Sequence, residues 1–152
     1  MMKKLLLLAF IAIACEAMAQ DAQCVPERAA MVEVIRAYAR SGAGLLGPQG
    51  ISESVLEAVG QTERHRFIPG RSCSVAYMDG PILIGQGQTI SQPFIVALMT
   101  DLAAVKFDHT VLEVGTGSGY QAAILARLVQ KVCTVEIIPP LTEAAATERP
   151  RL

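Results

Sequence analysis

Residues 109–137, HTVLEVGTGSGYQAAILARLVQKVCTVEI, decide the fold of this chain. A short β-branched and apolar run, Thr110–Val114, leads into a glycine-rich turn, and residues with helical apolar spacing follow up to Lys131. A second apolar run covers residues 132–138. Two buried-type strands joined by a helix of about ten residues form the βαβ unit of a parallel, doubly wound sheet. The sequence therefore predicts an α/β protein.

The glycines of the turn narrow the choice of ligand. Gly115, Gly117 and Gly119 follow the first strand, at the edge of the sheet where ligands bind in such folds. Glycine permits positive φ angles, a sharp turn and close approach of a flat cofactor to the backbone. A dinucleotide site has the spacing G-x-G-x-x-G, whereas here the spacing is G-x-G-x-G and Tyr120 occupies the sixth position. This spacing disfavours NAD.

Two carboxylates are expected at the same crevice as the glycine turn. Glu113 lies two residues before the first glycine, and Glu136 lies at the end of the second strand, 17 residues after Gly119. A carboxylate at the strand end can accept hydrogen bonds from ribose hydroxyls, and one near the turn suits a positively charged ligand. Adenosine with a cationic tail describes S-adenosylmethionine. The residues alone leave open that each carboxylate is only a surface residue at a strand end.

A second informative segment lies upstream, at residues 81–102. A short apolar run is followed by a Gly- and Gln-rich loop, which leads into a helix that begins at Pro93. The buried face of this helix is expected to consist of Ile95, Leu98, Met99 and Leu102. Ser91 has two interpretations: from the residues alone a capping serine ahead of the helix is favoured over an active-site residue.

Two amphipathic helices are predicted nearer the N-terminus. The first begins at Pro26 and reaches about Arg40, and the second runs from about Ser52 to Gly60. His65 follows between two arginines, without a Cys, Asp or second His at ligand spacing, which is typical of a packed or surface histidine. The chain has only two histidines and no C-x-x-C, so no metal site is predicted.

The quoted motifs resemble those of one enzyme family. Residues 112–137, LEVGTGSGYQAAILARLVQKVCTVEI, and residues 81–102, PILIGQGQTISQPFIVALMTDL, are similar to the protein-L-isoaspartate O-methyltransferases, which are class I S-adenosylmethionine-dependent methyltransferases. The resemblance covers about residues 51–146. It implies a Rossmann-like fold with N-terminal helices ahead of the first βαβ unit. It also implies methyl transfer from S-adenosylmethionine to the free carboxyl of isoaspartyl residues in damaged proteins, which is a protein repair reaction.

The resemblance assigns roles to particular residues. Ser91 matches the family's active-site serine and would hold the substrate carboxylate by a hydrogen bond. The expected cofactor-binding residues are Thr89, Ile90, Glu113, Gly115, Thr116, Gly117, Ser118, Gly119 and Glu136, and the expected substrate residues are Gln88 and Gln92. The substrate carboxylate is already ionised at neutral pH, so the reaction needs no general base.

The first nineteen residues read as a secretory signal peptide. Lys3 and Lys4 supply the positive region, residues 5–14 an apolar stretch too short to span a membrane, and residues 17–19 an A-x-A cleavage site. We therefore expect export, to a bacterial periplasm, of a mature chain of residues 20–152, with a cytoplasmic protein as the alternative. A lipoprotein-type cleavage at Cys15 is a weaker alternative. Cys24 and Cys73 are candidates for a disulfide in an oxidising compartment, and Cys133 is expected to be a core residue in a strand.

Composition and length limit the remaining possibilities. The 152 residues, 52% hydrophobic and 18% charged with a net charge of −1, fit one globular domain and give no basic footprint for nucleic acid. A monomer without stable membrane insertion is expected. Members of the resembled family continue through several more strands beyond the position of Leu152, so this chain is expected to be the N-terminal portion of a methyltransferase domain. Two hypotheses follow: an active methyltransferase, or a truncated, non-catalytic remnant that binds the cofactor weakly or not at all.

Overall fold

The computed structural model describes residues 24–41 and 50–147. The predicted signal peptide, its cleavage site, Cys15 and the last five residues lie outside the described residues. The elements, in chain order, are α2 (Val25–Ser41), α4 (Glu53–Gln61), the 3-10 helix η1 (Arg64–Phe67), α5 (Cys73–Ala76), β1 (Ile82–Gly85), β2 (Gln88–Ile90), α6 (Pro93–Leu102), β3 (Thr110–Val114), α7 (Tyr120–Leu125), β4 (Lys131–Val135) and α8 (Pro139–Thr147).

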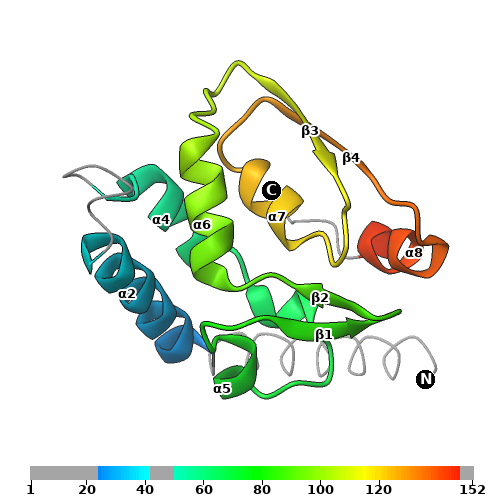
Figure 1. Ribbon diagram of the computed structural model, residues 1–152, viewed down its shortest axis with the longest axis horizontal. Coiled ribbons are helices and arrows are strands. Elements are labelled where there is room, and N and C mark those ends of the chain that lie inside the picture. The colour runs from blue at the N-terminus through cyan, green and yellow to red at the C-terminus, as the bar shows by residue number, and fades with distance from the viewer. Residues whose placement is uncertain (1–23, 42–49, 148–152) are drawn as a thin grey trace, which may run out of the picture.

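The predicted βαβ unit is confirmed. Strands β3 and β4 pair in parallel, with Glu113 opposite Thr134, and α7 connects them (Figure 1). Helix α7 is shorter than expected because the chain beyond Leu125 tightens into turns that end at the buried Val129. Strand β4 ends earlier than predicted, at Val135, because the carboxylate of Glu136 binds the amides that follow.

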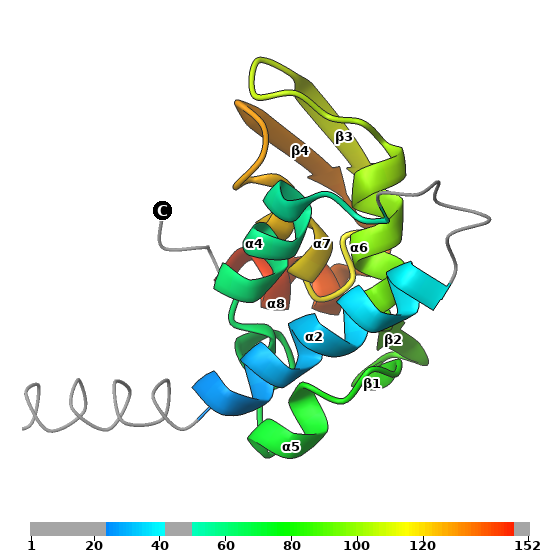
Figure 2. The same ribbon diagram turned by 90° about the vertical axis from the view of Figure 1, so that its left-hand side faces the viewer.

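The two predicted N-terminal helices are also confirmed, as α2 and α4. The two helices pack against each other and against α6, and Figure 2 shows this group of helices from the side of α2. Their buried residues are Met31, Ile35 and Ala39 on α2, and Val55, Leu56, Ala58 and Val59 on α4. An ion pair between Arg36 and Glu53 joins the exposed sides of the two helices. None of the helices that the structure describes is long and apolar enough to cross a membrane.

The Gly- and Gln-rich segment forms an antiparallel hairpin, not the loop predicted from the sequence. Strand β1 pairs with β2, and Gly85 lies opposite Gln88. The two residues between them, Gln86 and Gly87, have φ angles of 52° and 70°. Positive φ at both central residues is the mark of the two-residue turn whose twist matches a hairpin. The turn residues therefore allow two short strands where composition indicated a loop.

The predicted buried face of α6 is wrong. The residues that face inward are Pro93, Val96, Ala97 and Thr100. Met99 and Leu102, expected in the core, are 61% and 65% exposed, Ile95 is exposed as well, and Leu98 is half-buried. The inward face is the one that meets α2 and α4, and small residues there let the helices approach closely. The exposed residues form an apolar stripe on the opposite side.

The side chains of strands β3 and β4 are more exposed than their apolar sequences predicted. Leu112 and Val114 are 63% and 79% exposed, and Val135 is exposed too. Cys133, expected in the core, is only half-buried and is a free thiol. Helix α7 lies beside one face of the pair in both views (Figures 1 and 2). Strands rich in Val and Leu need cover on both faces, and here the described residues cover one.

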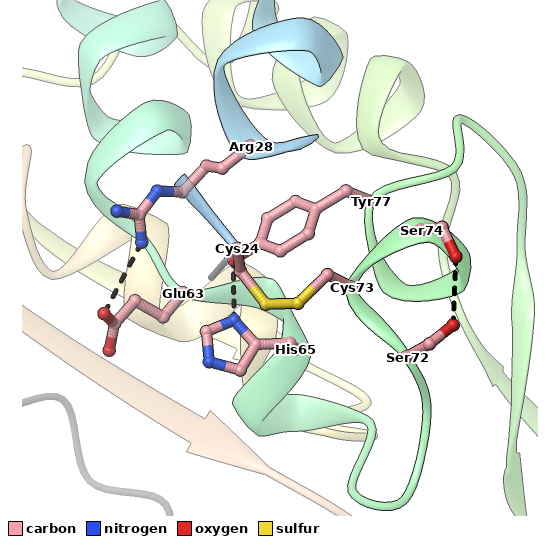
Figure 3. Close-up of a disulfide and its surroundings, with 8 residues drawn as sticks. All are labelled: Cys24, Arg28, Glu63, His65, Ser72, Cys73, Ser74 and Tyr77. Carbon is pink, nitrogen blue, oxygen red and sulfur yellow. Dashed lines mark hydrogen bonds and ion pairs between the residues drawn. A yellow bond between two sulfur atoms is a disulfide. The ribbon is translucent and has the colours of Figure 1, made fainter. Parts of the chain in front are cut away.

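A disulfide ties the start of α2 to the start of α5. The sulfurs of Cys24 and Cys73 are 2.02 Å apart, and the two residues are 49 positions apart in the sequence (Figure 3). Cys24 is buried. Beside the bridge, His65 Nδ1 lies 2.7 Å from the hydroxyl of Tyr77, so the histidine is a packed residue as predicted. The candidate pairing of the two cysteines is thus confirmed.

Candidate functional site

The glycine turn joins the end of β3 to the start of α7. Gly115, Gly117 and Gly119 have φ angles of 90°, 55° and 87°, so all three occupy the left-handed region that was predicted for them. The Gly119 amide donates to Thr116 O at 2.8 Å and closes the turn. The Gly115 amide donates to Val135 O at 2.8 Å, which fastens the turn to the end of the neighbouring strand.

Glu113 lies half-buried at the sheet end of this turn. Its Oε2 accepts a hydrogen bond of 2.5 Å from the Thr134 hydroxyl, and the Thr134 hydroxyl lies 2.6 Å from that of Thr116. Burial raises the pKa of Glu113, the hydrogen bond from Thr134 opposes that rise, and the negative charge of Glu136 adds to it. The two predicted carboxylates are therefore within electrostatic reach of each other.

Glu136 is already engaged by backbone amides. Its Oε2 accepts from the Gly117 amide at 2.8 Å, and its Oε1 accepts from the amides of Ile137 and Ile138 at 2.8 and 3.0 Å. These bonds, that from Gly117 first, lower the pKa of Glu136 and keep it ionised at neutral pH. The carboxylate thus anchors the middle of the glycine turn, and a ribose hydroxyl would share or replace these bonds.

Two hollows adjoin the turn. One of about 540 Å3 lies on the helix side and is lined by Thr116, Gly119, Thr134 and Glu136, together with alanines of α7 and α8. Its volume falls within the usual range for small-molecule sites. The other, of about 250 Å3, reaches Gly117 and Ser118 from the side of the hairpin. The glycine turn therefore forms a wall shared by both hollows.

The hairpin lies directly against the glycine turn. Ile84 of β1 and Gly117 line the same hollow, and a Cβ added to Gly117 would lie 3.7 Å from Cδ1 of Ile84. In the paired strand, Gln88 and Thr89 are exposed, whereas Ile90 is 3% exposed and belongs to the core. The structure thus brings the predicted substrate segment and the predicted cofactor turn together, with the Ile90 side chain supporting the hairpin from inside.

Ser91 is exposed and is not the cap of α6. Gln92 is the residue at the N-cap position, and the cap is supplied from a distance by Asp79. Asp79 Oδ1 accepts from the Phe94 amide at 2.9 Å, and Asp79 Oδ2 accepts from Gln92 Nε2 at 2.8 Å. The capping interpretation of the serine therefore does not describe its place in this fold.

Sequence reasoning missed three residues that organise this region. Thr134 links Glu113 to Thr116, and this could have been found from the parallel register, which places it opposite Glu113. Asp79 and the buried Arg64 carry no local signal, because their partners lie far away in the sequence. Within residues 24–41 and 50–147, no group of three or more His, Cys, Asp or Glu side chains could hold a metal ion.

Comparisons with known proteins agree with this geometry. The family model described as "Protein-L-isoaspartate(D-aspartate) O-methyltransferase (PCMT)" matches residues 46–150. The chain is 49% identical to protein-L-isoaspartate O-methyltransferase 1 of Cupriavidus necator, over 93% of this chain and 55% of the relative. It is 52% identical to protein-L-isoaspartate O-methyltransferase 2 of a Polaromonas species, over 73% of this chain and 53% of the relative.

Solved structures give the same fold. A protein-L-isoaspartate O-methyltransferase superposes with a TM-score of 0.65 at 25% identity, covering 79% of this chain and 37% of that one. A Plasmodium falciparum protein, described as a protein-L-isoaspartate O-methyltransferase in complex with S-adenosyl-L-homocysteine, has a TM-score of 0.57 at 21% identity. It covers 78% of this chain and 52% of that one, and it supports the fold alone.

The parallel βαβ unit, its glycine turn and its acidic strand end define a Rossmann-like α/β protein. With the matches to its sequence, the chain belongs to the protein-L-isoaspartate O-methyltransferase family. It spans about half the length of the curated relatives that it matches.

Proposed function

We propose that this chain carries the cofactor turn and substrate segment of a protein-L-isoaspartate O-methyltransferase, which methylates the free carboxyl of isoaspartyl residues in damaged proteins or peptides. The observation that carries the proposal is the proximity of the glycine turn to the hairpin that leads to Ser91, since Gly117 and Ile84 line the same hollow. Family membership supports it, as do the names of relatives about 50% identical to this chain.

S-adenosylmethionine is the cofactor that fits the turn. Glu136 ends the second strand as an ionised carboxylate, which suits hydrogen bonds from ribose hydroxyls. Glu113 places a second carboxylate near the turn, where a sulfonium cation would offset the cost of its burial. Thr116, Ser118 and the three glycines would line the path of the cofactor along the backbone. Tyr120 remains the residue that disfavours NAD.

The chemistry requires alignment more than acid–base catalysis. The substrate carboxylate, ionised at neutral pH, attacks the methyl carbon, the carbon–sulfur bond breaks, and the sulfur keeps the electron pair. The products are a methyl ester and S-adenosylhomocysteine. Ser91 would donate a hydrogen bond to the carboxylate, and Gln88 and Gln92 would bind the surrounding peptide. The family resemblance implies that the ester then closes to a succinimide, which can reopen as ordinary aspartate.

The alternative is a remnant of the family that does not catalyse methyl transfer. Transfer of a radiolabelled methyl group to an isoaspartyl peptide distinguishes the two, with the same peptide containing ordinary aspartate as control. We expect slow, isoaspartyl-specific transfer by the 152-residue chain and faster transfer by a chimera with the C-terminal portion of the Cupriavidus necator relative. A chimera indifferent to Ser91→Ala would overturn the role of the serine. An inactive chain that binds no cofactor, beside an active chimera, would favour the remnant.

We also propose that the protein is exported and begins at Gln20. The sequence features of residues 1–19 support this, and so does the Cys24–Cys73 disulfide, because such bonds persist in oxidising compartments. A monomer that does not bind nucleic acid is proposed as well, and the near-neutral charge supports the second point because it leaves no basic footprint. N-terminal sequencing of the natural protein tests the proposal. A protein that retains Met1 in the cytoplasm would contradict export.

A further inference from the structure

A buried arginine lies between the glycine turn and the substrate segment. Arg64, the first residue of η1, is 0% exposed. Its Nε donates to Ala76 O at 2.9 Å and its Nη2 donates to Gly80 O at 3.3 Å. Burial lowers the pKa of Arg64, which reflects the cost of keeping a charge in the interior. An apolar residue would fill this position more cheaply, so the guanidinium has a role beyond filling space.

One side of the guanidinium faces the end of the glycine turn. Its central carbon lies 4.9 Å from the centre of the Tyr120 ring, within the range of a cation–π interaction. Tyr120 directly follows Gly119 and is 1% exposed. Phe67, from the same 3-10 helix, packs edge-on against Tyr120, with the two ring centroids 5.5 Å apart. A Cβ added to Gly119 would lie 3.8 Å from Cε1 of Phe67. The 3-10 helix η1 therefore packs against the end of the glycine turn.

The other side of the guanidinium is linked, through Gly80 and Asp79, to the segment that contains Ser91. Arg64 holds the carbonyl of Gly80, and Asp79 is the residue immediately before it. The Asp79 carboxylate binds Gln92 Nε2 and the Phe94 amide, at 2.8 and 2.9 Å. Gln92 is the neighbour of Ser91, so the position of the serine follows the position of Asp79.

We propose that Arg64 is a positioning residue that sets the glycine turn in place relative to Ser91, by holding Tyr120 on one side and the Asp79–Gly80 backbone on the other. The inference rests on the proposed function, since it concerns the alignment of the same cofactor and substrate. A displacement of about 1 Å between reacting groups can slow a reaction on the order of a hundredfold. A rigid link between the two segments is therefore expected in a site that works by alignment.

A set of variants distinguishes the charge of Arg64, the planar geometry of its guanidinium and the aromatic ring of Tyr120. Arg64→Lys keeps a positive charge beside the Tyr120 ring but cannot donate to two carbonyls in the planar geometry of a guanidinium. Arg64→Met removes the charge and the hydrogen bonds to Ala76 O and Gly80 O. Tyr120→Phe keeps the ring and removes the buried hydroxyl, which also interacts with Arg64, whereas Tyr120→Leu removes the ring. Arg40→Met, at an exposed position in the last turn of α2, is the matched control for losing a positive charge.

The first measurement is amide hydrogen exchange by mass spectrometry on the 152-residue chain. In Arg64→Met we expect exchange in residues 115–121 and in residues 88–94 to accelerate together, by roughly tenfold or more, while α2 keeps its protection. Arg64→Lys and Tyr120→Phe should lie between Arg64→Met and the wild type, and Arg40→Met should match the wild type. Acceleration confined to η1, or equal throughout the chain, would overturn the proposal because it would show only a stability role.

The second measurement is binding of S-adenosylhomocysteine by calorimetry. We expect a loss of affinity of about tenfold in Arg64→Met and Tyr120→Leu and a smaller loss in Tyr120→Phe. Unchanged affinity in variants whose two segments exchange faster would overturn the positioning role. A wild-type chain that does not bind the probe would instead contradict the proposed function, so the two failures are distinguishable. If Arg64→Met does not fold, Arg64→Lys and Tyr120→Leu carry the same tests.

Discussion

Replacing Cys24 and Cys73 by serine together should lower the stability of the fold substantially. The bridge closes a loop with a sequence separation of 49 residues. In the chain-entropy model, a loop of that size restricts the unfolded chain by about 4 kcal/mol, and measured values are commonly 2–4 kcal/mol. Domains are stable by only about 5–15 kcal/mol, so the bridge supplies a large share of the margin. For a domain of this size the loss corresponds to a fall in Tm of roughly 10 °C.

Thermal unfolding followed by circular dichroism measures this loss. The double serine variant and the reduced wild type should unfold at similar, lower temperatures. Cys133→Ser is the matched control, because Cys133 is a free, half-buried thiol, and its Tm should change little. A double variant as stable as the oxidised wild type would show that the bridge does not stabilise the fold by restricting the unfolded chain.

Three further predictions follow from the geometry. Stability should fall as pH rises above about 4.5 through the raised pKa of Glu113, and fall as pH drops below 4.5 through the lowered pKa of Glu136. Urea unfolding measured against pH should lose the fall at higher pH in Glu113→Gln and the fall at lower pH in Glu136→Gln. If each variant instead lost the other dependence, the hydrogen bonding described for the two carboxylates would be contradicted. Leu112→Lys, at a residue 63% exposed, should lower the free energy of unfolding by at most about 0.5 kcal/mol in urea. Ile124→Ala, in the core, should lower it by about 2–5 kcal/mol. A large loss in Leu112→Lys would mean that this face of the sheet is covered. Gly117→Ala should destabilise by about 1–2 kcal/mol, since φ is 55° there and the space for a methyl group is adequate; a neutral result would show that the turn relaxes.

The local parts of the fold could be predicted because the signals are local. The glycines needed positive φ, and the apolar runs on either side had the spacing of strand and helix, so the βαβ unit followed from residues 109–137. The face of α6 could not be predicted, because residues 94–99 are all apolar and leave no polar side to mark the solvent. Only the packing against α2 and α4 selects Val96 and Thr100 as the buried residues.

In the candidate site, too, the features with local sequence signals could be predicted and those that depend on tertiary contacts could not. Glu113 and Glu136 could be placed at one crevice because parallel strands end at the same edge of a sheet. The bonds that Glu136 makes to backbone amides could not be predicted, because they depend on how the turn folds back over the strand end. Arg64 and Asp79 were missed for a similar reason, since a buried charge and a distant cap depend on tertiary contacts.

The most direct test of the account is the choice of cofactor. Isothermal titration of the chain with S-adenosylhomocysteine and with NAD should give binding of the first in preference to the second. Glu136→Ala should weaken S-adenosylhomocysteine binding by about 1.5–3 kcal/mol, because a charged hydrogen-bond acceptor is lost. Glu143→Ala, at an exposed carboxylate of α8, should leave the affinity unchanged. Tighter binding of NAD, or an affinity for S-adenosylhomocysteine that is the same in Glu136→Ala and the wild type, would contradict the assignment of this turn to S-adenosylmethionine.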